Sequence, residues 1–126
     1  MSDSPDLSRL KHKNDEVVLT FFVARDKEGG GWYALNRDLD LGGIGDTGQE
    51  AVESALDTAF QYLSHAYHSG HWDEMVPRPM PLKVRAKWHL LCLPTTLLPF
   101  LKEKECTEEK RQKPYQEFQR LVESTA

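Results

Sequence analysis

Apolar positions in the first half of the chain follow a pattern that predicts an antiparallel sheet. In EVVLTFFVA (16–24) the odd-numbered residues are large and apolar, and the run is rich in β-branched and aromatic residues, as in a central strand. Three consecutive glycines within 26–31 predict a hairpin turn, because such turns need positive φ angles. Further strands are expected at 32–36 and within 38–45.

The apolar period then changes to that of a helix. Thr47 is the expected N-cap, and Glu50 stands where a capping box needs it. Gly70 predicts the C-terminal end. The stripe at helical spacing consists of Val52, Ala55, Leu56, Ala59, Phe60, Leu63 and Tyr67. Residues 15–70 are therefore predicted to form an α+β domain, a small antiparallel sheet backed by one helix over 48–68.

The second half begins with a proline-containing linker at 71–82. KVRAKWHLLCLP (83–94) has the pattern of a strand, and helices are expected from about Thr95 and over 114–123. The segment 83–126 is thus predicted to have the order strand, helix, helix.

Glycines before the long helix raise the question of a phosphate-binding loop. The run from Gly43 to Gly48 matches the letters of a dinucleotide fingerprint, but Asp46 would place a negative charge where the pyrophosphate lies. A Walker-type loop would need a Lys-Ser/Thr pair at the helix start. We therefore interpret these glycines as sheet and turn geometry.

Composition limits the class of protein. A chain of 126 residues buries one modest core, and its net charge of −4 argues against a general nucleic-acid binder and suits a basic protein partner. Cys92 and Cys106 lack metal-ligand spacing and are expected to be reduced thiols in a cytoplasmic protein. Residues 1–14 lack a signal-peptide apolar core and are expected to form a flexible N-terminus.

The order of motifs in residues 15–70 is that of a known family. A strand is followed by Glu-Gly-Gly, an aromatic strand, Asp-Leu, Gly-Asp-Thr and an alanine-rich helix. The matching residues are Glu28-Gly29-Gly30, Trp32-Tyr33-Ala34, Asp38-Leu39, Gly45-Asp46-Thr47, Glu50-Ala51 and Ala55-Leu56. This stretch resembles the HicB-like antitoxin family, which implies a degenerate ribonuclease H-like fold.

The second half is similar to another family. LLCLPTTLLPFLKEKE followed by KPYQEFQRLVESTA resembles ribbon-helix-helix (CopG-type) proteins, with Leu93-Pro94 at the end of the strand. The inner helix faces would be Leu97, Leu98 and Leu101, then Phe118, Leu121 and Val122. This resemblance implies a DNA-binding and dimerisation segment. Because each ribbon needs a partner ribbon, it also implies a homodimer or a higher even-numbered oligomer.

The residues at the base-reading positions of this ribbon do not suit DNA. Trp88, Leu90 and Cys92 occupy these positions, and none can make a bidentate contact to a base edge. Either a bulge shifts the register, or the ribbon pairs with another chain and has lost operator reading. The run 102–113 is interpreted as a solvated helix end and loop. The candidate DNA-binding residues are Lys83, Arg85, Lys87, Lys110, Arg111 and Lys113.

Histidines, carboxylates and aromatic residues of the chain are further candidates for functional groups. A metal shell could consist of His65, His68, His71, Asp73 and Glu74, but histidines on a solvated helix face are the simpler interpretation. No acid lies within the first strand, where a two-metal nuclease needs one, so Asp38, Asp40 and Asp46 are interpreted as turn and cap residues. Trp32 and Tyr33 are either core residues or the partner-binding residues.

The expected function is that of an antitoxin that neutralises a small basic toxin by protein binding and regulates its own operon through DNA. The alternative is an inhibitor or decoy of the same fold without a DNA function, and a metal-dependent hydrolase using the histidines is a third hypothesis. No catalytic residues, cofactor, metal or membrane association are expected.

Overall fold

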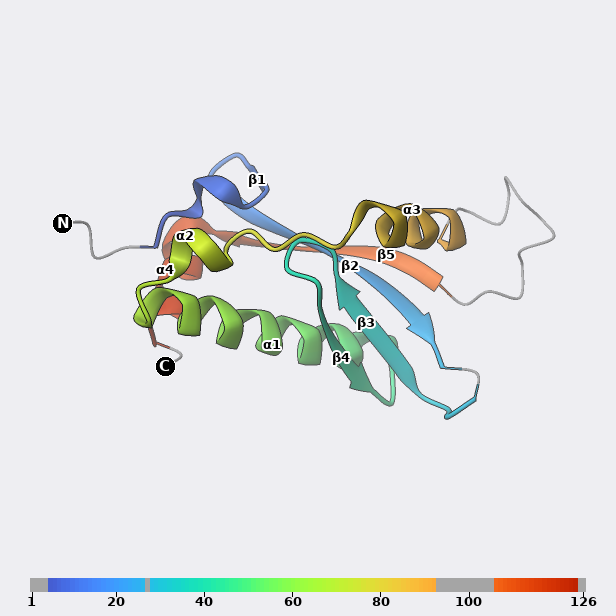
Figure 1. Ribbon diagram of the computed structural model, residues 1–126. Coiled ribbons are helices and arrows are strands. Elements are labelled where there is room, and N and C mark those ends of the chain that lie inside the picture. The colour runs from blue at the N-terminus through green and yellow to red at the C-terminus, as the bar shows by residue number, and fades with distance from the viewer. Residues whose placement is uncertain (1–4, 27, 93–105, 125–126) are drawn as a thin grey trace.

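In the computed structural model, residues 5–26, 28–92 and 106–124 are described. One sheet lies between helices on its two faces (Figure 1). In chain order the elements are η1 (Leu7–Arg9), β1 (His12–Lys13), β2 (Glu16–Arg25), β3 (Trp32–Asn36), β4 (Leu41–Gly45), α1 (Gly48–His68), α2 (Trp72–Met75), α3 (Leu82–Leu91), β5 (Cys106–Pro114) and α4 (Tyr115–Ser124).

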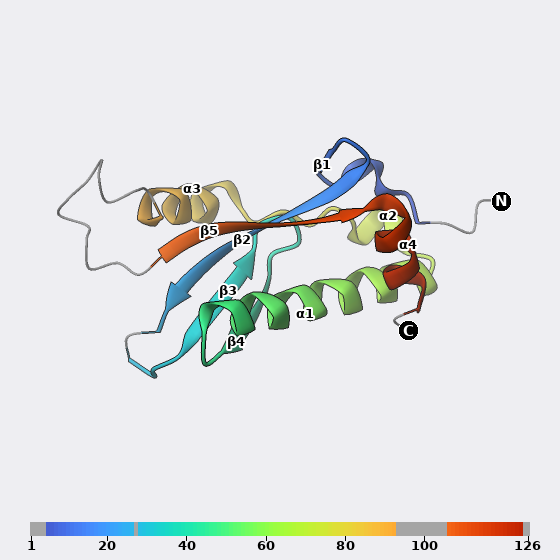
Figure 2. The ribbon, with the colours of Figure 1, turned by 180° about the vertical axis from the view of Figure 1, so that it is seen from behind.

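Strand β2 is the centre of the sheet. One of its edges pairs antiparallel with β5, from Glu16 opposite Pro114 to Ala24 opposite Cys106. Its other edge pairs with β3 and, at its beginning, with the short β1, while β4 pairs with the far side of β3. The views from front and back show the same arrangement (Figures 1 and 2). The expected α+β architecture with an antiparallel sheet is confirmed.

Helices α1 and α4 cover one face of the sheet. The odd-numbered residues of β2 enter this core, as the period-two pattern predicts. Phe118 and Val122 of α4 belong to the same core, and the Phe118 ring lies 5.2 Å from the Phe60 ring of α1. Residues on both sides of the predicted linker 71–82 therefore share one hydrophobic core.

Helix α3 covers part of the opposite face. The even-numbered residues of β2 point to this side, and Phe22 is fully buried there. Its ring lies 6.1 Å from Trp88 and 5.1 Å from His89, both of α3. Every residue of β2 from 17 to 24 is buried, so the strand is covered on both faces. It was expected to be covered largely on one face.

The N-terminus of α1 has the expected cap. The Glu50 amide donates to Thr47 Oγ1 at 3.1 Å, and the Asp46 amide donates to Glu50 Oε2 at 2.9 Å. The Glu50 side chain therefore accepts its hydrogen bond from the amide of Asp46, the residue before the N-cap, and not from the Thr47 amide. The predicted bounds of this helix, 48–68, are confirmed.

The strand expected at 83–94 is wrong for its described residues, because Leu82–Leu91 is helix α3. The alternation of basic residues suggested a strand, but Arg85, Trp88 and His89 are spaced to share one helix face. The loop expected within 102–113 is also corrected, because Cys106–Pro114 is strand β5. The helix expected from Thr95 begins outside the described residues.

These corrections remove the ribbon-helix-helix order from the described part of the tail. The helix expected over 114–123 is confirmed as α4, but it follows a strand whose partner is β2 of the same chain. A dimer was expected because a ribbon would have no partner strand within its own chain. In the structure, β5 has such a partner.

Glycines in β4 allow α1 to lie directly on the strand. A Cβ added to Gly43 would overlap the Ala55 amide nitrogen, and one added to Gly45 would lie 2.6 Å from Glu50 Cβ. These glycines therefore serve close helix–strand packing, in agreement with the interpretation as sheet geometry.

We predict that Gly43→Ala lowers the free energy of unfolding by about 1–3 kcal/mol, because the added methyl group must displace the α1 backbone. Chemical denaturation measures this change. Ile44→Ala is the control, because Ile44 is 78% exposed and points away from α1. Equal stability of the Gly43→Ala and Ile44→Ala variants would contradict the close packing.

Candidate functional site

A cavity of about 380 Å³ lies beside the start of α3. Four separate parts of the chain form it: the η1–β1 segment, the connection after β3, the segment before α3 and the first turn of α3. The lining residues are Arg9, Leu10, Lys11, Arg37, Asp38, Pro77, Pro79 and Arg85. Four cationic side chains thus surround one carboxyl group.

Asp38 is held by the sheet. Its Oδ2 accepts a hydrogen bond from the Thr20 amide at 2.8 Å and lies 3.4 Å from Asn36 Nδ2. Burial raises the pKa of the Asp38 carboxyl above its ordinary value, while the Thr20 amide, Arg37 and Lys11 act in the opposite direction. The charge of the cavity therefore depends on the protonation state of Asp38.

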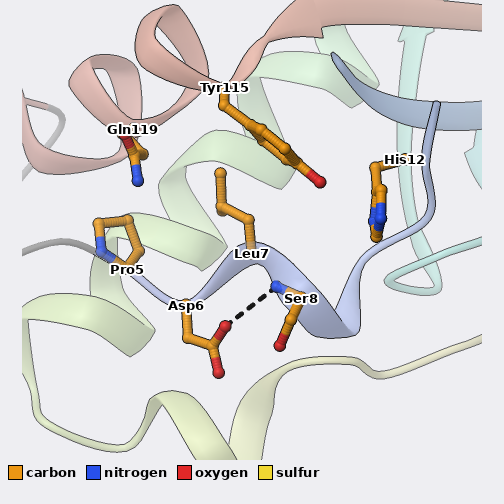
Figure 3. Close-up of a pocket in the computed structure, with 7 residues that line it drawn as sticks. All are labelled: Pro5, Asp6, Leu7, Ser8, His12, Tyr115 and Gln119. Carbon is orange, nitrogen blue, oxygen red and sulfur yellow. Dashed lines mark hydrogen bonds between the residues drawn. The ribbon is translucent and has the colours of Figure 1, made fainter. Parts of the chain in front are cut away.

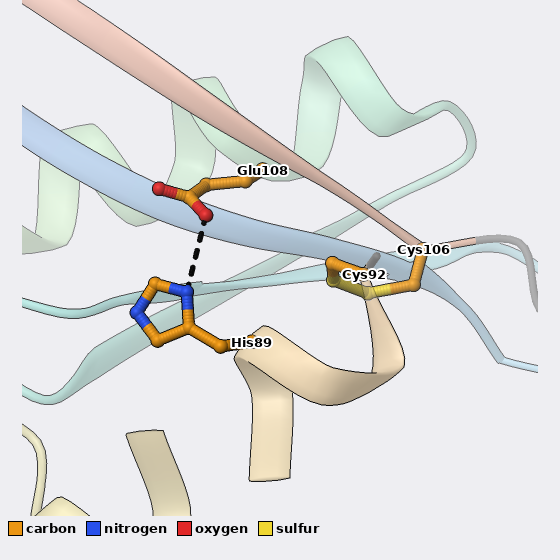
Figure 4. Close-up of a disulfide and its surroundings, with 4 residues drawn as sticks. All are labelled: His89, Cys92, Cys106 and Glu108. Atoms are coloured by element: carbon orange, nitrogen blue, oxygen red, sulfur yellow. Dashed lines mark ion pairs between the residues drawn. A yellow bond between two sulfur atoms is a disulfide. The ribbon is translucent and has the colours of Figure 1, made fainter. Parts of the chain in front are cut away.

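Arg37 connects the cavity to α3 and β5. Its side chain is only 15% exposed; one guanidinium nitrogen donates to Thr20 Oγ1 at 3.3 Å and the other lies 3.4 Å from His89 Nε2. His89 Nδ1 lies 3.4 Å from the Glu108 carboxylate. Figure 4 draws this contact as a dashed line. His89 thus lies between the Arg37 guanidinium and the Glu108 carboxylate, with one ring nitrogen directed at each.

A disulfide joins the same two elements near their ends. Cys92 and Cys106 are linked between the end of α3 and the start of β5 (Figure 4). The expectation of two reduced thiols is therefore wrong for this structure. Their separation of 14 residues carried no signal for pairing, because only the fold of α3 over the sheet brings them together.

A second, larger cavity is lined by fewer charged side chains. About 610 Å³ in volume, it lies between the N-terminal segment and α4 (Figure 3). The Asp6 carboxylate there accepts a hydrogen bond from the Ser8 amide, which caps η1, and the His12 and Tyr115 rings lie 5.7 Å apart. The smaller cavity is the stronger candidate, because its charged groups converge from separate elements.

The predicted DNA-binding residues of α3 do not form a ribbon face. Lys83 and Lys87 are exposed, whereas Arg85 is half-buried and lines the 380 Å³ cavity. The predicted base-reading positions are used otherwise: Trp88 stacks on Phe22, and Cys92 is in the disulfide. The shifted-register hypothesis, which needs a strand here, has no basis in a helix.

Three of the predicted DNA-binding residues belong to β5, and they lie on two faces of the sheet. Lys110 stands opposite Thr20 on the α3 face, whereas Arg111 and Lys113 stand opposite Leu19 and Val17 on the α1 face. Arg111 lies 3.3 Å from Glu109, and Lys113 lies 3.5 Å from Glu117. The structure therefore does not bring the six basic residues to one surface.

The predicted partner-binding aromatics also point to opposite faces. Trp32 packs against the α1 core, whereas Tyr33 lies on the α3 face, 5.8 Å from the Trp88 ring. Ile44, 78% exposed, is the cross-strand partner of Tyr33. We call Tyr33, Ile44 and Trp88 the apolar patch. Sequence reasoning found Tyr33, assigned Trp88 to a base-reading position and did not single out Ile44; α3 and β4 bring these two residues to Tyr33.

The residues weighed as a metal shell are spread apart. His71 Nδ1 lies 3.7 Å from Glu74, and His68 Nε2 lies 3.0 Å from the Glu123 carbonyl oxygen. Within 5–26, 28–92 and 106–124, no group of three His, Cys, Asp or Glu side chains is placed to hold a metal ion. In these same ranges no helix has the length and apolar character needed to cross a membrane.

Comparisons of the chain with protein-family models, with curated proteins and with solved structures found no match.

The raised pKa of Asp38 predicts a pH dependence of stability. A carboxyl that holds its proton more tightly in the folded protein destabilises the fold as the pH rises from the ordinary pKa of 3.8 through the raised pKa. We expect the free energy of unfolding of Asp38→Asn, relative to wild type, to rise with pH across this window and then to be constant. Urea unfolding at a series of pH values measures this difference.

Asp40→Asn is the matched control, because Asp40 is an exposed carboxylate in the same connection. An equal rise in the relative stability of Asp40→Asn would contradict the assignment of the effect to the burial of Asp38.

Proposed function

We propose that this protein is a non-catalytic binding protein, and specifically an antitoxin of the HicB-like kind that captures a small basic toxin. The apolar patch is the observation that carries the proposal. Tyrosine and tryptophan are enriched among the residues that dominate protein interfaces, because they bury much area at a low entropic cost. Here they lie beside an exposed isoleucine on the edge strand of the sheet.

Carboxylates lie at one end of this patch. Arg25, Trp32 and Gly45 form one row across β2, β3 and β4, so the turn after β2 and the junction after β4 lie at the same end of the sheet (Figure 1). These two connections carry Asp26, Glu28 and Asp46. Burial raises the pKa of the Tyr33 hydroxyl, and the negative charge of Asp26 adds to this effect. An apolar centre with an acidic rim suits a basic protein partner.

The arrangement of basic residues favours the alternative in which the protein lacks a DNA function. Lys83, Lys87 and Lys110 are the exposed members of the predicted DNA-binding set. Contacts from lysines alone to phosphates would give weak, salt-sensitive binding with little choice of sequence. Capture of a partner protein is therefore the function that we propose for the fold, and operon regulation would need residues beyond this set.

We predict that Tyr33→Ala and Ile44→Ala each weaken binding of the small basic protein encoded by the neighbouring reading frame. The expected loss is about tenfold or more for Tyr33→Ala, because the ring is a central contact. The measurement is calorimetric titration of the purified partner, paired with rescue of growth when both proteins are expressed.

Leu82→Ala is the control, because Leu82 is an aliphatic residue of similar exposure, at 70%, outside the apolar patch. An unchanged affinity of Tyr33→Ala would contradict the patch as the binding surface. The absence of a short basic protein in the neighbouring frame would instead contradict the antitoxin assignment.

A further inference from the structure

The 380 Å³ cavity holds positive charge that the described part of the chain does not compensate. Arg9 lies 3.7 Å from the Asp73 carboxylate, and Arg37 lies 3.9 Å from Glu108. Neither Lys11 nor Arg85 forms an ion pair with a described residue. The carboxyl group that lines the cavity with them belongs to Asp38.

The cations converge on the cavity from separate elements. Lys11 belongs to the segment before β1, Arg37 follows β3, and Arg85 lies in the first turn of α3. Because these elements are far apart in sequence, the fold itself assembles the cluster. The planar guanidinium groups of two arginines suit the bidentate recognition of an oxyanion, which a lysine supports as a point charge.

Helix α3 adds a further favourable group. It begins after Pro81, which donates no amide hydrogen, and its N-terminus has no side-chain cap. Uncapped amides at the start of a ten-residue helix present partial positive charge to an anion. Pro79, two residues before Pro81, lines the cavity, so this helix end lies beside it.

Part of the cavity wall is apolar. Leu10, Pro77 and Pro79 form it, and none of these side chains carries a polar group. The volume is at the lower end of the range for small-molecule sites, about 300–1,000 Å³, and exceeds the needs of a bare phosphate ion. A lining that combines cationic and apolar side chains suits a phosphate group attached to an apolar body.

We propose that this cavity binds a small organic phosphate monoester. The phosphate lies between Lys11, Arg37 and Arg85, and the organic body lies against Pro77 and Pro79. The site is separate from the apolar patch, so this proposal does not depend on the identity of the protein partner.

The test is a titration of the full chain with phenyl phosphate at constant ionic strength, followed by NMR chemical shifts and calorimetry. We expect saturable binding that shifts the amide resonances of Arg37, Asp38 and Arg85. The double variant Lys11→Gln with Arg85→Gln should lose affinity by about tenfold or more, because both are charge-assisted contacts. Inorganic phosphate should bind more weakly, since it makes no contact with the apolar wall.

Lys83→Gln with Lys87→Gln is the matched control, because it removes the same charge from exposed positions on the same helix. This variant should bind phenyl phosphate as the wild type does. An equal loss of affinity in both double variants would show that the positive charge of the whole surface attracts the ligand, and it would overturn the proposal. The absence of saturable binding would also overturn it. Equal affinity for inorganic phosphate would overturn the role of the apolar wall. Lys11→Gln alone, at an exposed position, keeps the test valid if the Arg85 substitution disturbs α3.

Discussion

The pairing of β2 on both of its edges is the constraint on which the rest of the structure depends. Nine residues of β5 pair with one edge, while β3 and β1 use the other. Residues 17–24 are therefore buried on both faces, and each face needs its own cover. The α1 and α4 helices cover one face, and α3 covers part of the other. Removal of β5 would expose a row of unpaired backbone groups along the central strand.

The placement of α3 creates both candidate sites. Trp88 packs on Phe22 and Tyr33, which puts an aromatic ring beside the exposed Ile44. Toward the start of the same helix, Arg85 enters the cavity that contains Asp38. The contact of His89 with Glu108 and the Cys92–Cys106 disulfide join this helix to β5. The apolar patch and the charged cavity are thus two consequences of a single packing arrangement, with different chemistry and different expected ligands.

Local signals in the sequence account for what could be predicted. The glycine turn, the Thr47 cap and the helical stripe each act within a few residues, so the first half of the fold follows from them. Strand β5 gave no such signal, because an edge strand of charged residues lacks apolar alternation. The Arg37-Asp38 pair at the end of an aromatic strand was the only local sign of the cavity. Its other groups come from segments whose proximity depends on long-range pairing.

Native-state hydrogen exchange, followed by NMR, tests the central role of the β2–β5 pairing most directly. Amides of β5 that point to β2 should exchange as slowly as the amides of β2 itself, because both open only when the sheet unfolds. Alternate amides on the outer edge of β5 should exchange quickly. Rapid exchange throughout Cys106–Pro114, with slow exchange retained in β2 and β3, would contradict the account and show that the tail is independent of the sheet.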